Sequence, residues 1–214
     1  FVHLGIHSEY SITDSIVRIK PLVKAAAADN QRALALTDLS NLYATVKFYR
    51  ACLGAGIKPI IGSEVIMDNE DTRLTLLAMN NEGYQNITRI VSLGFTEGRA
   101  DPVNHGTPVI KRSHILEHAA GVIVLLTEKS DVGQALVGSM PEKADELLTE
   151  WQAQFGDRLY FAIKRTNRSG EDAFIRAAIH SGAKHNIPII AHNDVRFLAQ
   201  EDFDAHEARV CIAG

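Results

Sequence analysis

The chain has 214 residues, of which 46% are hydrophobic and 22% are charged. This composition excludes an intrinsically disordered chain and provides a core for one large domain or two small ones. The net charge is −4, and no Lys/Arg run is longer than a pair. The sequence therefore gives no sign of the basic patch that is typical of a protein holding nucleic acid by itself.

Cysteine usage and hydropathy argue against several further classes of protein. Only Cys52 and Cys211 occur, far apart and without a C-x-x-C spacing, which argues against a disulfide framework or zinc ribbon and favours a reducing cytoplasm. No apolar run approaches the ~18–20 residues of a membrane span, and no signal peptide is visible. Because the chain starts at Phe1, we expect a single domain, residues 1–214, from the N-terminus of a longer protein.

Short apolar or β-branched runs alternate with helical segments along the chain. Strands are predicted over residues 1–6, 32–38, 57–67, 73–80, 121–127, 158–166 and 187–195. Helices are predicted over residues 20–31, 41–56, 82–95, 141–155, 171–186 and 201–212. Pro21 suits the first turn of the first helix, and Gly54 or Gly56 closes the second. The polar segment 98–111, with its Gly and Pro, is predicted to be an exposed loop.

This alternation predicts an α/β fold with a mostly parallel sheet. The runs "ALAL", "GVIVLL" and "IPIIA" are apolar throughout, as in strands buried on both faces. Seven or eight βα units in a chain of this size favour a barrel, with an open doubly wound sheet as the alternative. No G-x-G-x-x-G or G-x-x-x-x-G-K-[ST] follows the first strand, so the phosphate-binding versions of the open sheet lose support.

Ionisable residues follow several strands directly. His7 follows the strand-like run "LGI", Asp38 follows "LALT", Glu64 follows "PIIGS" and Asp194 follows "PIIAHN", and Asp14 lies on the first loop. In a parallel βα barrel these ends share one face, so the side chains would suit a divalent metal such as Mg²⁺, Mn²⁺ or Zn²⁺. Taken singly, Asp38 and Asp194 fit turn or helix-capping roles better than metal binding.

The remaining histidines and the aromatic residues have structural interpretations. His residues at 105, 114, 118, 180 and 185 fall in predicted loops or helices, and we expect them to be exposed or internally paired. Trp151 and the Phe and Tyr residues fall on apolar stripes, which predicts that they lie in the core.

Several segments resemble, in order, successive motifs of the PHP (polymerase and histidinol phosphatase) domain: "FVHLGIHSEYSITDS", "ALALTDLSNLYATVKFY", "GAGIKPIIGSEV", "LTLLAMNNEGYQNITRI" and "AHNDVRFLAQEDFDAHEARVCI". They are most similar to the N-terminal PHP domains of bacterial replicative DNA polymerase III alpha subunits, a family in which "GIKPIIG" and "NxxGYxN" together are distinctive. The resemblance weakens only across residues 97–120 and 135–156. It implies a distorted, TIM-like (β/α)7 barrel, in agreement with the strand pattern.

Active PHP domains hold up to three metal ions and hydrolyse phosphoesters, with the metals activating water. The resemblance implies that some ligand positions survive in this chain, namely His7, Asp14, Asp38, Glu64 and Asp194. Others are replaced, by Gly5, Leu39, Arg73, Thr166 and Arg196, and the family's Cys falls near Glu128. We therefore expect a degenerate site with no catalytic residue and no metal, or Mg²⁺ or Mn²⁺ at low occupancy.

Two of the replaced ligand positions carry arginine, which predicts ion pairs in place of metal ions. Arg73 and Arg196 are permanent cations and, beside carboxylates, would take over the charge role of the metals. His192 and Arg165 are further candidates for this network.

The leading hypothesis, implied by the resemblance, is a non-catalytic scaffold that docks a separate proofreading 3′–5′ exonuclease subunit, epsilon, and braces the polymerase core during DNA replication. The parent protein would be a cytoplasmic DNA-directed DNA polymerase, a nucleotidyltransferase, whose remaining chain is a partner and whose holoenzyme contacts DNA. The domain itself would not be an enzyme and would not contact a membrane. A residual metal-dependent phosphoesterase or pyrophosphatase is the alternative, followed by an unrelated metal hydrolase of the barrel class.

Overall fold

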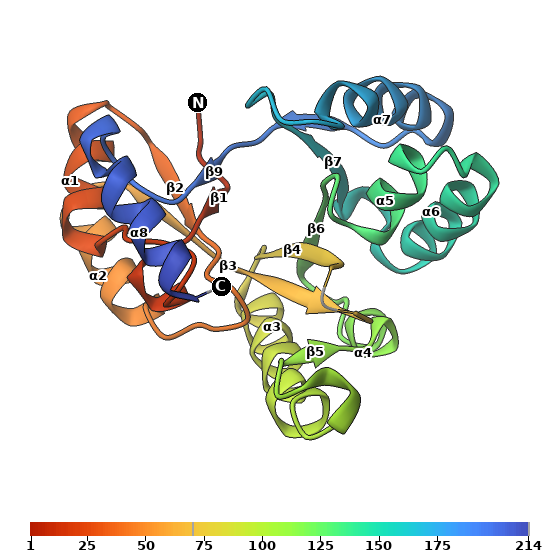
Figure 1. Cartoon of the computed structure of the whole chain (residues 1–214), viewed down its shortest axis with the longest axis horizontal. Coiled ribbons are helices and arrows are strands. Elements are labelled where there is room, and N and C mark those ends of the chain that lie inside the picture. The colour runs from red at the N-terminus through yellow and green to blue at the C-terminus, as the bar shows by residue number, and fades with distance from the viewer. Residues whose placement is uncertain (70, 214) are drawn as a thin grey trace. The chain divides into compact units, whose positions relative to one another are not determined.

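The computed structural model describes residues 1–69 and 71–213. The chain forms two compact units, Phe1–Ser63 with Asn193–Gly214 (unit 1) and Glu64–His192 (unit 2) (Figure 1). Strand β3 (Lys58–Met67) begins in unit 1 and ends in unit 2. The assignment of the whole chain to one domain stays a prediction.

Unit 1 combines short strands with two packed helices and a C-terminal helix. Its strands are β1 (Gly5–Ile6), β2 (Ala33–Leu36), the first part of β3 and β9 (Asp194–Val195). Its helices are α1 (Ile19–Ala28), α2 (Thr45–Gly54) and α8 (Phe203–Ala213), with 3-10 turns at Glu9–Ser11 and Gln200–Asp202. β2 pairs in parallel with β3, and β1 pairs in parallel with β9.

The core of unit 1 lies between these strands and helices α1 and α2. On α1 the buried residues Ile19, Leu22, Val23 and Ala26 follow the i, i+3, i+4, i+7 spacing of one helix face. They pack with Leu34 and Leu36 of β2 and with Phe48 and Cys52 of α2 in one apolar cluster. The apolar run "ALAL" is thus buried, as the sequence predicts.

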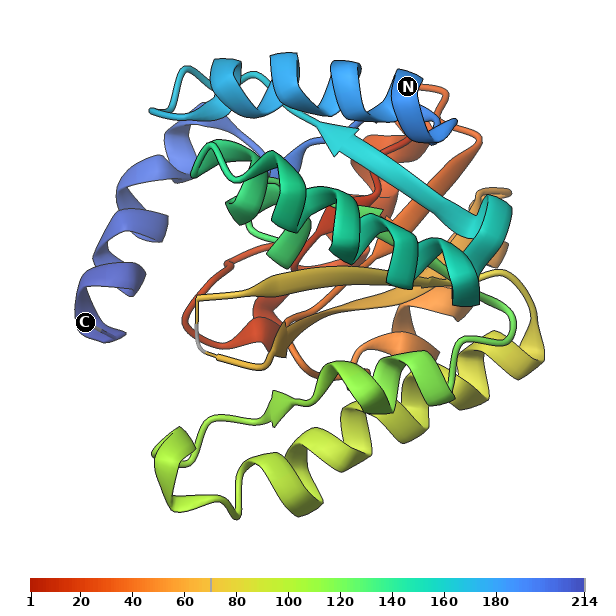
Figure 2. The same cartoon turned by 90° about the vertical axis from the view of Figure 1, so that its right-hand side faces the viewer.

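Unit 2 continues the sheet in the order β3-β4-β6-β7-β8, with β5 paired to β3. These strands are β4 (Arg73–Ala78), β5 (Val109–Ile110), β6 (Val122–Leu126), β7 (Leu159–Ile163) and β8 (Ile189–Ala191). The helices are α3 (Asn81–Leu93), α4 (Arg112–Glu117), α5 (Asp131–Val137), α6 (Pro141–Phe155) and α7 (Glu171–His185). A π-helical turn covers Gly94–Gly98, and 3-10 turns cover Pro102–Asn104 and Gly156–Arg158. Figure 2 shows α6 and α7 running along β7.

The prediction of a mostly parallel sheet is confirmed for most of the strand pairs whose direction the structure describes. β3 with β5, β6 with β7 and β7 with β8 are parallel, whereas β4 and β6 are antiparallel. β4 runs against β6 because β3 ends at Met67 and β4 begins at Arg73, too few positions apart for the crossover that a parallel neighbour would need.

The prediction of an exposed loop at 98–111 is wrong at its C-terminal end. Val109 and Ile110 form β5 and are buried, whereas the Gly- and Pro-containing residues before them do form turns. The aromatic prediction is confirmed for Trp151 and four Phe residues but not for Phe1, Tyr43, Tyr49, Tyr84 and Phe203, which are exposed.

The distinctive "NNEGYQN" motif joins α3 to the turn before β6. Asn80 caps α3 by accepting a hydrogen bond from Gly83 N at 2.9 Å, and Asn86 Nδ2 donates to Ala120 O at 2.7 Å. A Cβ at Gly83 would lie 1.8 Å from the carbonyl oxygen of Gly121. The motif is therefore accounted for by close packing of backbone, and none of these contacts involves an ionisable side chain.

Candidate functional site

In unit 1, His7, Asp14 and Arg196 are linked through one carboxylate. His7 follows β1 and is buried, and its Nδ1 contacts Asp14 Oδ2 in a short hydrogen bond. Arg196 follows β9, and its Nε lies 2.9 Å from the same Asp14 oxygen. Parallel pairing of β1 with β9 brings the two residues to the same end of the strands, and His7 N donates to Val195 O at 3.2 Å. The guanidinium therefore lies where the resemblance places a metal-binding histidine.

The neighbouring Asp38 is bound by hydroxyl and amide groups. Its carboxylate accepts hydrogen bonds from Ser8 N at 2.6 Å, from Ser8 Oγ at 3.0 and 2.8 Å, and from Ser11 Oγ at 2.7 Å. Its backbone carbonyl accepts from Ser63 Oγ at 2.8 Å. Asp38 is 1% exposed, so these four contacts take the place of water around the carboxylate. The structure thus gives Asp38 a role in holding the first loop.

The other predicted positions of unit 1 lie beside these two groups. Gly5 and Asp194 are register partners in the β1–β9 pair. Leu39 follows Asp38, is half-buried, and donates its backbone N–H to Ser11 Oγ at 3.0 Å. Its apolar side chain has no lone pair to offer a metal.

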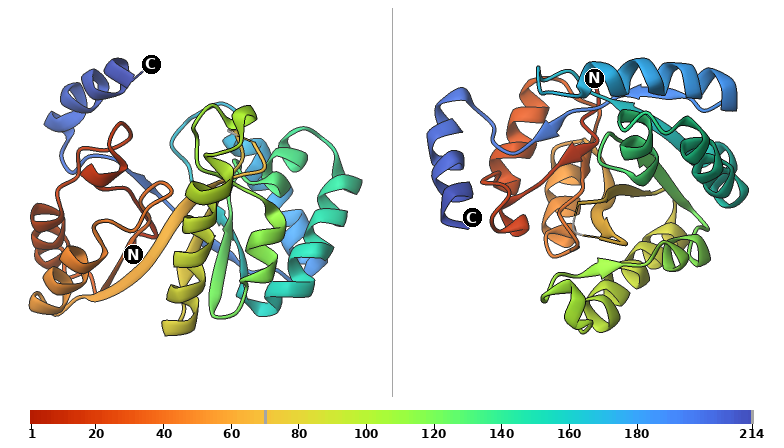
Figure 3. Two further views of the ribbon diagram at one scale, coloured as in Figure 1. Left: turned by 90° about the horizontal axis from the view of Figure 1, so that it is seen from below. Right: turned by 45° about the vertical axis from the view of Figure 1, so that its right-hand side comes forward.

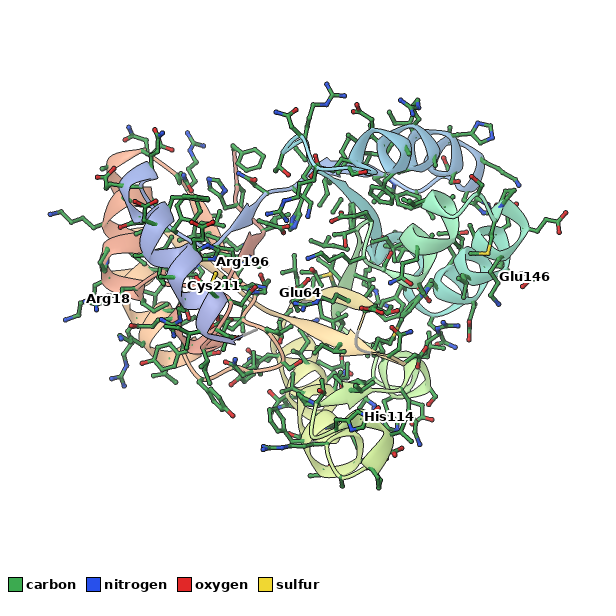
Figure 4. The ribbon with its side chains drawn as sticks, in the orientation of Figure 1. Arg18, Glu64, His114, Glu146, Arg196 and Cys211 are labelled. Atoms are coloured by element: carbon green, nitrogen blue, oxygen red, sulfur yellow. The ribbon has the colours of Figure 1, made fainter. Side chains whose placement is uncertain are left out.

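In unit 2, Glu64 of β3 faces Arg73, the first residue of β4. Arg73 Nη1 lies 3.7 Å from Glu64 Oε2, and Glu64 is 8% exposed. Figure 4 labels Glu64 on β3 and, in unit 1, Arg196 after β9. A carboxylate with so little access to water needs a nearby positive charge, which Arg73 supplies.

A second ion pair in unit 2 occupies the position of the family's cysteine. Glu128 follows β6 and Lys164 follows β7, and the parallel pairing of these strands places both residues at one edge. Lys164 Nζ lies 2.7 Å from Glu128 Oε1, and the lysine side chain is only 4% exposed. Sequence reasoning missed Lys164 and named its neighbour Arg165. That prediction is wrong, because Arg165 is 71% exposed and pairs with Asp172.

Thr166 and His192 complete the predicted set. Thr166 donates from its N and Oγ1 to the carboxylate of Glu171, at 2.6 and 2.5 Å, which fixes the start of α7. Burial opposes the charge of Glu171, but the hydrogen bonds from Thr166 outweigh it and lower the pKa of the carboxyl. His192 is buried after β8, and its N donates to Ile163 O at 2.8 Å.

The histidines expected to be structural are exposed or paired. His114, labelled in Figure 4, lies 3.5 Å from Glu97, and His118 Nδ1 contacts His114 O at 2.9 Å. His185 Nε2 lies 2.7 Å from Asp145 Oδ1, whereas His105 and His180 are exposed.

The donor set does not fit a metal ion. In unit 1 the Asp38 oxygens are hydrogen-bonded by serines, and Asp14 is bound by a histidine and a guanidinium. In unit 2 the Glu64 and Glu128 carboxylates each face a cation. Among the described residues, no three His, Cys, Asp or Glu side chains form a group that could hold a metal. A cation brought to these carboxylates would have to displace hydrogen bonds and would meet the repulsion of Arg196, Arg73 or Lys164.

Comparison with known proteins assigns the family. The model of the PHP domain matches residues 3–166. This chain belongs to the PHP domain family. Over 99% of its length it is 44% identical to the DNA polymerase III subunit alpha of Pseudomonas fluorescens, 43% to that of Pseudomonas aeruginosa and 41% to that of Escherichia coli K12. It spans 18% of the length of each of these relatives.

Solved structures share the PHP fold at low sequence identity. An amidohydrolase from Chromobacterium violaceum matches 97% of the chain with a TM-score of 0.56 and 15% identity, and 96% of that protein is covered. A putative metal-dependent phosphoesterase from Bifidobacterium adolescentis matches with a TM-score of 0.53 and 13% identity over the same shares. Together with the family match, these similarities confirm the predicted PHP-type α/β fold. Within the described residues, no helix is both long and apolar enough to cross a bilayer.

Proposed function

We propose that this PHP domain is a non-catalytic part of a replicative DNA polymerase alpha chain, in which it braces the polymerase and docks the proofreading 3′–5′ exonuclease subunit, epsilon. The observation that carries the proposal is the pairing at the replaced ligand positions. Arg196, Arg73 and Glu128 stand at three of these positions, and each forms an ion pair. The similarity to alpha subunits over 99% of the chain supports the assignment to a polymerase.

The ion pairs suit a scaffold because they are stable without a bound ion. Carboxylates at strand ends repel one another unless a cation lies among them. A metal ion can dissociate, and the carboxylates would then repel one another again. An arginine side chain is permanently charged and covalently attached, so its compensation of the negative charge persists. The former ligand positions therefore supply fixed polar contacts between loops, which keep the surface of the domain constant.

The alternative is a residual phosphoesterase. In its favour, His7, Asp14, Asp38, Glu64 and Asp194 keep ligand-type side chains. Against it, the Asp38 oxygens are hydrogen-bonded by Ser8 and Ser11, and cations lie against Asp14 and Glu64.

Binding to the exonuclease tests the scaffold directly. The complete polypeptide that contains this chain would be mixed with the epsilon subunit of the same replicase, and complex formation measured by calorimetry and size-exclusion chromatography. We expect a stable complex that the PHP chain, added in excess, competes away. Absence of a complex, or a complex that the PHP chain does not affect, would contradict docking on this domain.

A further inference from the structure

A pocket of about 350 Å³ lies in unit 1 along helix α1. Leu22, Ala25 and Ala26 of α1 form one wall, and residues of the segment 193–198, which contains β9, form the other. Figure 3 shows β9, in blue, beside β1, in red, in agreement with their parallel pairing. The volume lies within the range of roughly 300–1,000 Å³ that is typical of small-molecule sites. We call this feature the α1 pocket.

The α1 pocket lies on the opposite side of the β9 segment from the former ligand positions. Successive residues of an extended segment point to opposite sides, so Val195 and Arg196 point apart. Arg196 pairs with Asp14, whereas Val195 packs against the apolar core of unit 1 and lines the pocket. The pocket is therefore separate from the ion pairs described above.

Gln31 is held at the pocket by the way in which α1 ends. Asn30 adopts the left-handed conformation (φ 56°), and Gln31 N donates to Ala26 O at 2.9 Å, which closes the helix in a Schellman motif. The residue at the position of Gln31 in such a motif frequently makes an apolar contact with the helix. Here it brings an amide to a pocket whose other lining residues are mostly apolar.

The amide of Gln31 has one favourable orientation. Its Nε2 donates to Asp29 Oδ2 at 2.9 Å, and because a carboxylate only accepts, a flipped amide would place two acceptors together. Gln31 Oε1 is buried and accepts no hydrogen bond from any residue that the structure describes. A buried acceptor without a donor is unfavourable, so a molecule that donates to Oε1 from the pocket would be stabilised there.

The charge of the pocket indicates which donor it accepts. Its lining within the described chain includes Asp29 but no Lys or Arg. A phosphate or carboxylate would therefore meet a negative charge and no cation. An amino group suits both neighbours, because one N–H can donate to Gln31 Oε1 and the other can point towards the carboxylate of Asp29.

An aromatic wall indicates a flat ligand. Phe197 lines the pocket, and its ring packs edge-on against Phe203 of α8, with 5.9 Å between the ring centroids. His206, also on α8, lies 5.5 Å from the same ring, so the orientation of Phe197 is fixed by two contacts. His3 adds a second aromatic ring to the lining. Flat heterocycles stack on such side chains.

We propose that the α1 pocket binds an uncharged aromatic amine, a flat nitrogen heterocycle whose amino group donates to Gln31 Oε1 beside Asp29. Adenine and cytosine carry this chemistry, and the ring would lie against Phe197. The walls are in place without the ligand, because Leu22 and Ala26 belong to the core of unit 1, so binding requires no refolding. The inference does not depend on the proposed scaffold role.

Matched ligands test the amino group. The complete polypeptide that contains this chain would be titrated by calorimetry with adenosine and with inosine, in which a carbonyl oxygen replaces the amino group. We expect adenosine to bind at least about tenfold more tightly, because the inosine oxygen would face the Gln31 acceptor. AMP should bind more weakly than adenosine, because Asp29 repels its phosphate. Equal binding of inosine, or tighter binding of AMP, would overturn the inference.

Two variants with matched controls locate the site. Gln31→Leu removes the acceptor, and its control is Gln85→Leu at an exposed position of α3. Ala25→Phe fills the pocket from an exposed position of α1, and its control is Ala27→Phe, exposed on the same helix outside the pocket. We expect Gln31→Leu and Ala25→Phe each to weaken adenosine binding at least about tenfold, and both controls to leave it unchanged. Gln31→Leu should also remove the preference over inosine.

The remaining outcomes decide against the inference. Absence of adenosine binding at millimolar concentration would overturn it. Binding that survives both Gln31→Leu and Ala25→Phe would place adenosine elsewhere in the polypeptide, and equal weakening by Ala27→Phe would show a general effect on α1. Thermal unfolding midpoints would show which variants fold, and should Gln31→Leu unfold, the comparison of Ala25→Phe with Ala27→Phe still decides the question.

Discussion

Arg196 Nε lies 2.9 Å from Asp14 Oδ2, the oxygen that also contacts His7 Nδ1. One carboxylate thus joins the loop after β1 to the segment after β9, which are nearly 190 positions apart in the sequence. The backbone of this region is fixed as well, because Ser15 Oγ donates to the carbonyl oxygens of both His7 and Arg196. The arginine is therefore part of the structure of unit 1, with a role that a neutral side chain would not fill.

Replacing Arg196 by Ala should destabilise unit 1. The change removes the cation from Asp14, whose side chain is 30% exposed, so water compensates for part of the loss. We expect a cost of about 1–2 kcal/mol in the free energy of unfolding, below the 3–5 kcal/mol typical of a fully buried pair. Denaturant unfolding measures it, with Arg176→Ala as the control. A cost equal to that of the control would show that the pair contributes nothing.

The Lys164–Glu128 pair should show strong coupling. Lys164→Met leaves Glu128 without its cation at a site where the lysine was 4% exposed, and we expect a cost of about 2–4 kcal/mol. Adding Glu128→Leu should recover much of that loss, because the uncompensated charge is then absent. A double-mutant cycle measures the coupling, and additive single costs would contradict the account.

The two cations at the end of β7 illustrate what the sequence can and cannot predict. Successive residues of a strand point to opposite faces, so "IKRT" alone allows either Lys164 or Arg165 to face inward. A shift of one residue exchanges them, and only the pairing with β6 resolves the choice. The positions of His7 and Asp38 just after strands, in contrast, followed from the apolar runs before them, whereas Glu64 lies inside β3, which continues to Met67.

Helix prediction succeeded where capping signals were clear. Helix α6 covers residues 141–155 as predicted, because Pro141 begins it and Gly156, at φ 54°, ends it. Helices α4 and α5 were missed because six and seven residues are too short for a periodic pattern.

Gly83→Ala should destabilise unit 2, although alanine favours helix. Its Cβ would lie 1.8 Å from Gly121 O, so α3 or the Gly121 turn must move. We expect a cost of about 1–3 kcal/mol, as for an overpacked core. Gly54→Ala is the matched control, since its Cβ would meet nothing within 4 Å, and it should be neutral or slightly stabilising. Thermal unfolding compares them, and equal midpoints would contradict the close packing.

Acid should weaken the start of α7. Hydrogen bonds from Thr166 and Arg168 lower the pKa of Glu171 in the folded protein below its ordinary value of 4.5, despite the opposing effect of burial. A carboxyl whose pKa is lower in the folded protein than in the unfolded chain stabilises the fold when the pH is above the unfolded-chain pKa. This stabilisation is lost as the pH falls through the folded-state pKa. Glu171→Gln should therefore be less stable at neutral pH and lose less stability on acidification below about pH 4.5. Unfolding curves across that range test it, and parallel pH profiles for both proteins would contradict it.

Metal content most directly tests the claim that the ligand positions are filled by internal ion pairs. The purified chain would be incubated with Mn²⁺, desalted and analysed for bound metal, beside a variant with His restored at 5, 39, 73 and 196. We predict far less than stoichiometric metal and no phosphoester hydrolysis for the unaltered chain, and increased metal binding for the restored variant. Stoichiometric metal on the unaltered chain, with hydrolysis that is lost on Asp38→Ala, would contradict the account and favour a working phosphoesterase.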